Sequence, residues 1–90
     1  MNREHGRMQL VVPELQELVG KRAGTELREV FEDYEPVEIA QILREFSLRD
    51  KVYLFSLWDI DFAADIFAKL DEDMQIEVLG FIDDLSLIHI

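Results

Sequence analysis

The sequence predicts an all-α fold, a right- or left-handed superhelix of about six short helices arranged in pairs. Three observations support this prediction. Apolar residues recur at the i, i+3, i+4, i+7 spacing of a helix along most of the 90 residues. The apolar pattern also repeats after 24 residues, which indicates an α-solenoid of stacked helix pairs. In addition, proline, serine and aspartate stand where helices are expected to begin.

The repeat relates residues 39–58 to residues 63–82. The compared pairs are apolar in both copies: Ile39 with Ala63, Ala40 with Ala64, Ile42 with Ile66, Leu43 with Phe67, Phe46 with Leu70, Val52 with Ile76, Leu54 with Val78, Phe55 with Leu79, Leu57 with Phe81 and Trp58 with Ile82. A single helix pair cannot bury both of its apolar faces, so we expect the pairs to stack on one another. The shared position of Ala40 and Ala64 predicts a close helix approach at both.

An upstream copy of the repeat is incomplete. Arg22 stands where Phe46 would be, and Leu27 aligns with Lys51. We therefore count two well-formed repeats and one degenerate repeat before them.

The six helices are expected at roughly residues 13–22, 25–34, 36–46, 48–57, 60–70 and 72–84. Gly20 and Gly24 favour a loop between the first two. The third begins at Pro36. Proline has no backbone N–H, and in the first turn of a helix that N–H would have no partner within the helix. The fourth begins after Ser47, whose spacing from Asp50 is that of a capping box.

The last two helices follow the same logic. The fifth carries an apolar stripe formed by Ala63, Ile66, Phe67 and Leu70. The sixth begins after Asp71, which is expected to cap it, and two further acidic residues then lie at the positive end of the helix dipole. The sequence contains neither an alternating strand pattern nor a linker. We therefore expect one domain over residues 1–90, with residues 1–12 flexible or additional to it and residues 85–90 unassigned.

The charge is large, negative and unevenly placed. The net charge is −11, and residues 29–90 alone hold four basic and sixteen acidic residues, a net of −12. Such a field repels a phosphate backbone, which excludes nucleic acid as a partner, and it favours a basic protein surface or a divalent cation. There is no cysteine, so disulfides and thiolate metal sites are excluded.

Other function classes also lack support in the sequence. No apolar run approaches the ~20 residues that span a bilayer, so no direct membrane insertion is expected. His5 and His89 lie at opposite ends of the chain, and no serine or threonine has a neighbouring His–acid arrangement. We therefore predict that the protein is not an enzyme and has no catalytic or cofactor-binding residues.

Two acidic patches are candidate cation sites. The first consists of Asp59, Asp61 and Asp65, and the second of Asp71, Glu72, Asp73 and Glu77. Oxygen ligands suit Mg²⁺ or Ca²⁺. The alternative is that these residues cap helices and form a solvated surface. The second patch is not an EF-hand, because the loop glycine is missing and the helical pattern continues through it.

Two stretches, residues 27–43 and residues 62–79, resemble the cytosolic N-terminal domain of MgtE-type magnesium transporters. The features that carry the resemblance are a proline at a helix start, the Ala63-Ala64-Asp65 motif and the ordered pattern around them. The resemblance covers about residues 14–82. Flagellar motor switch proteins have similar helical repeats.

The resemblance implies a regulatory cytosolic domain that senses Mg²⁺ and helps to gate a pore. In that family the N-terminal superhelix precedes a pair of CBS domains and a dimeric membrane pore. Bound Mg²⁺ bridges acidic residues of the N-terminal and CBS domains and holds the pore shut. Asp65 occupies the acidic position of the Ala-Ala-Asp motif and is the ligand position carried over, with Asp61 and Asp59 as its acidic neighbours.

Several expectations follow from the resemblance. Mg²⁺ should bind this chain weakly and be shared with another domain. The expected partners are the CBS domains and the membrane pore domain of the same full-length chain, which would form a homodimer. The location would be the cytoplasmic face of the bacterial inner membrane, with the isolated domain soluble. The alternative function is an acidic helical-repeat interaction module, of flagellar-switch or scaffold type, that docks a basic partner.

Overall fold

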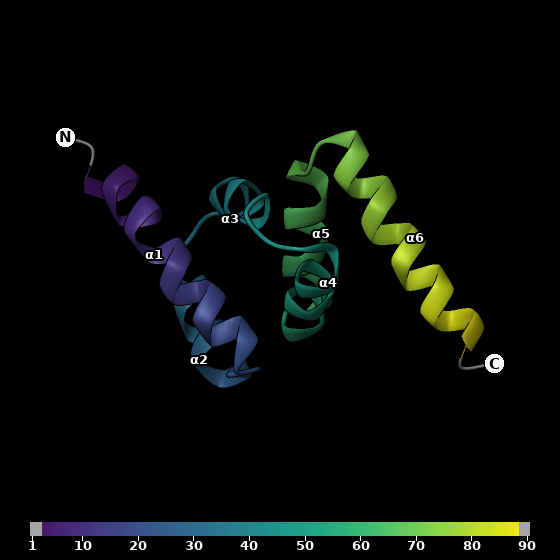
Figure 1. The fold of residues 1–90 in the computed structure, drawn as a ribbon. Coiled ribbons are helices and arrows are strands. Elements are labelled where there is room, and N and C mark those ends of the chain that lie inside the picture. The colour runs from purple at the N-terminus through teal and green to yellow at the C-terminus, as the bar shows by residue number, and fades with distance from the viewer. Residues whose placement is uncertain (1–2, 89–90) are drawn as a thin grey trace.

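The computed structural model describes the backbone of residues 3–88 and the side chains of residues 12–82. This part of the chain contains six helices and no strand: α1 (Arg3–Gly20), α2 (Gly24–Phe31), α3 (Pro36–Leu43), α4 (Leu48–Leu57), α5 (Ile60–Lys69) and α6 (Glu72–Ile88) (Figure 1). The predicted fold class is therefore confirmed. The side chains of His5 and of residues 85–90, His89 among them, lie outside the described residues. No helix among the described residues is both long and apolar enough to cross a bilayer.

The 24-residue repeat of the sequence is a repeat of helices. Helices α2, α4 and α6 begin at Gly24, Leu48 and Glu72, and helices α3 and α5 begin at Pro36 and Ile60. Helix α3 packs against α5, and α4 packs against α6, so each helix of one pair contacts its counterpart in the next pair. Helices α1 and α2 pack against each other. This stacking is compatible with the predicted superhelix and gives an elongated body of 49 × 28 × 21 Å.

The helix starts follow the capping signals of the sequence. Pro36 is in the first turn of α3, where Glu35 and Glu38 form a capping box. The Ser47 hydroxyl accepts a hydrogen bond of 3.2 Å from the Asp50 N–H at the start of α4. Each contact satisfies an N–H group that has no partner within its helix. Four of the six predicted starts consequently agree with the structure to the residue.

The first helix differs from its prediction. It begins at Arg3 instead of residue 13, and Pro13 lies inside it. Proline is common in the first turn of a helix, which is why it suggested a start. The last helix is also longer than predicted, because it continues to Ile88.

The apolar stripes form one continuous core. Its buried residues are Leu15, Val19, Leu27, Phe31, Tyr34, Ile39, Ala40, Ile42, Leu43, Phe46, Leu54, Ile66, Leu70, Met74 and Val78. The repeat is preserved in three pairs in which both members are buried: Ile42 with Ile66, Phe46 with Leu70 and Leu54 with Val78. Residues at the same place in successive repeats therefore share the same interior.

The predicted equivalence of Ala40 and Ala64 is wrong. Ala40 is buried, with 5% of its surface exposed, whereas Ala64 is exposed. The physical reason is that α5 covers the face of α3 that carries Ala40. The corresponding face of α5 lines an open apolar groove of about 490 Å³, together with residues of α4 and α6. Close approach therefore holds at the first site only.

Arg22 explains why the upstream repeat is degenerate. Its backbone has a φ of 56°, a left-handed conformation that glycine adopts more readily than other residues. The Arg22 guanidinium donates to the Val19 carbonyl at 3.0 Å and to the Asp50 carboxylate at 3.2 Å, and it lies 4.4 Å from the centre of the Tyr53 ring. The first repeat thus has a cation where the later repeats have an apolar core residue, and this cation connects the α1–α2 turn to α4.

Replacing Arg22 tests this backbone conformation. Arg22→Gly and Arg22→Ala both lose the contacts to Asp50 and Tyr53, but only glycine adopts a positive φ without strain. Arg22→Gly should therefore be more stable than Arg22→Ala by about 1 kcal/mol. Urea denaturation followed by circular dichroism measures the difference. An alanine variant as stable as the glycine variant would show that the turn is not strained.

Lys51 occupies the other irregular position of the repeat. It is 8% exposed, and its ammonium lies 3.8 Å from the Glu77 carboxylate of α6. The aliphatic part of the side chain takes the place of the equivalent Leu27, while its charged end reaches the edge of the core. A lysine can therefore occupy a leucine position in this stack.

Candidate functional site

The three aspartates predicted as metal ligands lie at the start of α5 and on its first two turns. Asp59 is the N-cap residue of this helix, and its Oδ1 atom accepts a hydrogen bond of 2.9 Å from the Phe62 N–H. One oxygen of this carboxylate is therefore engaged in holding the helix end. The structure thus assigns Asp59 a capping contact, and only its second oxygen remains for a ligand.

Asp61 and Asp65 form a different kind of pair. They are four residues apart on α5 and both are exposed, so their side chains extend from the same face of the helix, with about 5–6 Å between their Cβ atoms. Neither carboxylate has an ion-pair or hydrogen-bond partner in the described part of the chain. The structure therefore brings Asp61 and Asp65 together and leaves both available.

These residues fit only part of a magnesium site. Among the described side chains, no group of three or more carboxylates or histidines is arranged to hold a metal ion. Mg²⁺ is commonly bound by one or two carboxylates and keeps several waters. Asp61 and Asp65 match that limited set, provided that further oxygen ligands come from outside the described residues.

The second acidic patch has structural contacts instead. The Asp71 Oδ1 atom accepts a hydrogen bond of 2.9 Å from the Met74 N–H, and its Oδ2 atom lies 3.8 Å from the Arg44 guanidinium. Glu77 is paired with Lys51, as described above. Glu72 and Asp73 are exposed in the first turn of α6. Capping and ion pairing therefore account for two members of this patch, Asp71 and Glu77.

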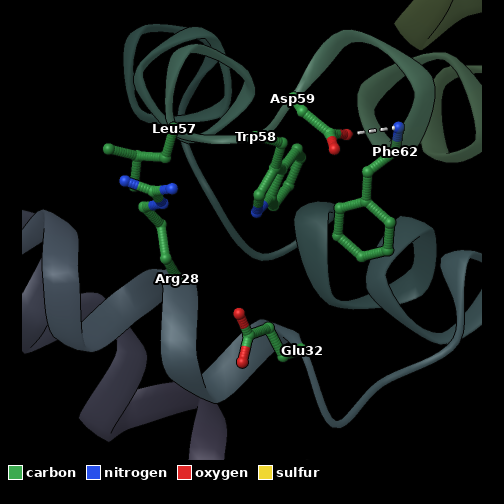
Figure 2. A pocket seen from close by; sticks show the side chains of 6 residues that line it. All are labelled: Arg28, Glu32, Leu57, Trp58, Asp59 and Phe62. Atoms are coloured by element: carbon green, nitrogen blue, oxygen red, sulfur yellow. Dashed lines mark hydrogen bonds between the residues drawn. The ribbon is translucent and has the colours of Figure 1, made fainter.

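Sequence analysis did not identify a pocket of about 300 Å³ between α2 and the α4–α5 junction. It is lined by Arg28, Glu32, Leu57, Trp58, Asp59 and Phe62 (Figure 2). The Trp58 Nε1 atom is buried and has no hydrogen-bond partner among the described residues, and the indole edge points toward the space between Arg28 and Glu32 (Figure 2). An unsatisfied buried donor costs about 1–3 kcal/mol, so an acceptor entering this pocket would be stabilised there.

The aromatic residues around this pocket pack against one another. The Trp58 ring makes edge-on contacts with Phe31, Phe55 and Phe62, with centroid distances of 5.4, 5.2 and 5.9 Å. The pocket arises because α2 and α5, about 30 residues apart in sequence, converge on this ring. No short sequence motif predicts that these two helices pack around the same ring.

Comparison with known proteins adds one finding. The family model described as the MgtE intracellular N domain matches residues 34–90, which include helices α3 to α6 and both acidic patches. Comparisons with curated proteins and with solved structures gave no match.

Proposed function

The chain belongs to the MgtE intracellular N domain family, a family of magnesium transporter domains and not of enzymes, and we propose that it senses cytosolic Mg²⁺ and helps to gate the pore. In this proposal the CBS domains and the membrane pore domain of the same full-length chain are its partners, in a homodimer at the cytoplasmic face of the bacterial inner membrane. The observation that carries the proposal is the exposed, unpaired Asp61–Asp65 pair within the matched residues.

The roles of the residues follow from their positions. Asp61 and Asp65 extend their carboxylate oxygens from one face of α5. Asp59 caps the start of the same helix and so stabilises the backbone that carries these two side chains. A bound Mg²⁺ would supply positive charge between these carboxylates and the acidic groups of a second domain. Without that charge, the field of residues 29–90, with a net charge of −12, repels an acidic neighbour. Domain contact would thus depend on Mg²⁺ concentration.

A titration of the 90-residue chain tests the proposal. Because the Asp61–Asp65 pair supplies only two carboxylates, Mg²⁺ should bind with a Kd on the order of millimolar or weaker. NMR shifts should be largest at Asp61 and Asp65. Monovalent salt at the same ionic strength should reproduce much of any gain in melting temperature, which comes from screening, but not the shifts of these two residues. Micromolar binding would contradict a shared site.

Asp65→Asn is the matching test in the transporter that contains this domain. The variant should need a higher Mg²⁺ concentration to close the pore, and its melting temperature should be unchanged because Asp65 has no partner among the described residues. Asp73→Asn, at an exposed acid in the first turn of α6, is the control and should close normally. Unchanged closure by Asp65→Asn would leave this residue a solvated surface group.

The alternative of a flagellar-switch or scaffold module receives less support. The family match lies with magnesium transporter domains, and the available carboxylates are grouped as a partial cation site.

A further inference from the structure

The pocket between α2 and the α4–α5 junction contains polar groups that the fold itself does not use. The Trp58 Nε1 atom is buried and has no hydrogen-bond partner among the described residues. Arg28 and Glu32 are four residues apart, on α2 and at its C-cap, so their side chains extend to the same side. Neither side chain has an ion-pair partner in the described part of the chain. Both are exposed, so a change of rotamer can admit a ligand to the indole edge between them (Figure 2).

The charges of the lining select against a charged ligand. One basic and two acidic side chains line the pocket, Arg28 with Glu32 and Asp59, a net charge of −1. A carboxylate could accept from the Trp58 N–H and from Arg28, but it would meet two like charges. An ammonium or guanidinium group has no acceptor for the indole N–H and would be repelled by Arg28. The pocket therefore favours an uncharged group that both accepts and donates.

A primary carboxamide has this combination on two separate atoms. Its oxygen accepts up to two hydrogen bonds, and its nitrogen donates two. A hydroxyl group also accepts and donates, but through a single oxygen, so it does not reach opposite sides of the pocket equally well. The carboxamide can accept from Trp58 and Arg28 on one side and donate to Glu32 on the other.

The rest of the lining is apolar. Leu57 and Phe62 complete the pocket, and the Phe62 ring lies 5.9 Å from that of Trp58, centroid to centroid. The volume of about 300 Å³ is at the lower end of the range for small-molecule sites. A ligand of this pocket therefore carries a compact apolar group beside its polar end.

We propose that this pocket binds a primary carboxamide attached to a compact apolar group. The carboxamide oxygen accepts from the Trp58 Nε1–H and from the Arg28 guanidinium, its nitrogen donates to the Glu32 carboxylate, and the apolar group packs against Leu57 and Phe62. The carboxamide belongs either to a free small molecule or to a glutamine or asparagine side chain elsewhere in the transporter. Binding uses no metal ion and neither member of the Asp61–Asp65 pair, so its failure would leave Mg²⁺ sensing untouched.

Three probes of the same shape and different charge test the chemistry. They are para-fluorobenzamide, para-fluorobenzoate and para-fluorobenzamidine. Trp58 is the sole tryptophan of the chain, so a single indole N–H resonance in the NMR spectrum reports on the site. The benzamide should move this resonance downfield and saturably, with a Kd on the order of 1 mM for so small a ligand. The benzoate and the benzamidine should bind about fivefold more weakly or worse.

A matched pair of variants on α2 and its C-cap locates the ligand. Glu32→Gln should weaken binding of the benzamide several-fold, because it removes a charge-assisted hydrogen bond. The same change should strengthen binding of the benzoate, since one of the two like charges is gone. Glu29→Gln is the control: Glu29 is exposed on α2 but does not line the pocket, and both affinities should equal those of the unmodified chain.

Two further variants test the donors. Trp58→Phe removes the indole N–H and should weaken binding of the benzamide about tenfold, measured by fluorine NMR of the ligand. Because this change also leaves a smaller ring in the core, Arg28→Gln supplies a second test at an exposed side chain. It should weaken binding several-fold and leave the melting temperature unchanged.

The transporter that contains this domain distinguishes the two sources of the carboxamide. Fluorine NMR of para-fluorobenzamide measures binding to a protein of any size. Equal affinity for the 90-residue chain and for the transporter would assign the pocket to a free small molecule. Binding to the chain alone would show that a side chain of the transporter already fills the pocket.

Three results would overturn the proposal. The first is no saturable movement of the indole resonance up to about 20 mM para-fluorobenzamide, which would leave the pocket to water. The second is equal binding of the three probes, or equal effects of Glu32→Gln and Glu29→Gln. The third is an upfield movement of the indole resonance in the ligand-free Glu32→Ala protein, which would show that Glu32 itself accepts the hydrogen bond of Trp58.

Discussion

Phe31→Ala should lower the free energy of unfolding by about 3–5 kcal/mol, the usual cost of truncating a buried phenylalanine. Phe31 is 0% exposed, and its ring makes edge-on contacts with Tyr34 and Trp58 at centroid distances of 6.5 and 5.4 Å. It therefore joins α2 to the α4–α5 junction, which are otherwise distant in sequence. Since small domains are stable by only about 5–15 kcal/mol, this loss is a large share of the total and should lower the melting temperature markedly.

Chemical denaturation followed by circular dichroism measures this loss. Phe31→Leu should cost less than Phe31→Ala, because leucine fills most of the cavity. Ile60→Ala is the surface control, since Ile60 is 83% exposed, and it should change stability by less than about 0.5 kcal/mol. If the midpoint for Phe31→Ala fell as little as that for Ile60→Ala, the convergence of α2 on the α4–α5 junction would be wrong.

Ala40→Leu and Ala64→Leu should have very different effects although the two alanines align in the repeat. Ala40→Leu forces a larger side chain between α3 and α5 and should cost about 1–3 kcal/mol. Ala64→Leu extends into the open groove on α5 and should change stability by less than about 0.5 kcal/mol. The difference in urea midpoints between the two proteins is the quantity to measure.

Ala68→Leu provides the control for helix propensity. Ala68 is exposed on the same helix as Ala64 but does not line the groove, so the two leucine variants of α5 should be equally stable. If Ala64→Leu were as destabilising as Ala40→Leu, another part of the chain would have to cover α5. Equal stability of all three variants would instead show that α3 and α5 are not in close contact.

Helix starts could be predicted from the sequence because their causes are local. Pro36, Ser47 and Asp71 act within one turn of their own positions. The structure shows Pro36 in the first turn of α3, and the side chains of Ser47 and Asp71 cap the starts of α4 and α6. Helix ends were predicted less well. Helices α2 and α3 end at Phe31 and Leu43, whereas their apolar stripes continue for three more residues. Neither end is followed by a glycine, the residue that most often marks the end of a helix.

Burial and ligand availability depend on the neighbours of a residue in space, which the repeat alone does not specify. Ala40 and Ala64 are equivalent along the chain, but only one has a helix on top of it. In the same way, the sequence places three aspartates in one candidate site. The structure shows that Asp59 caps the start of α5, whereas Asp61 and Asp65 have no partner among the described residues. The orphaned indole N–H of Trp58 depends on packing between distant helices and had no sequence signal.

The contact of each helix with its counterpart in the next pair also determines how the domain can fold. Because α3 packs on α5 and α4 on α6, most of the interactions that stabilise the core connect residues only about one repeat apart, and loop closure between them is inexpensive in entropy. Low contact order of this kind favours rapid folding. It also gives quasi-one-dimensional cooperativity, in which order propagates from pair to pair.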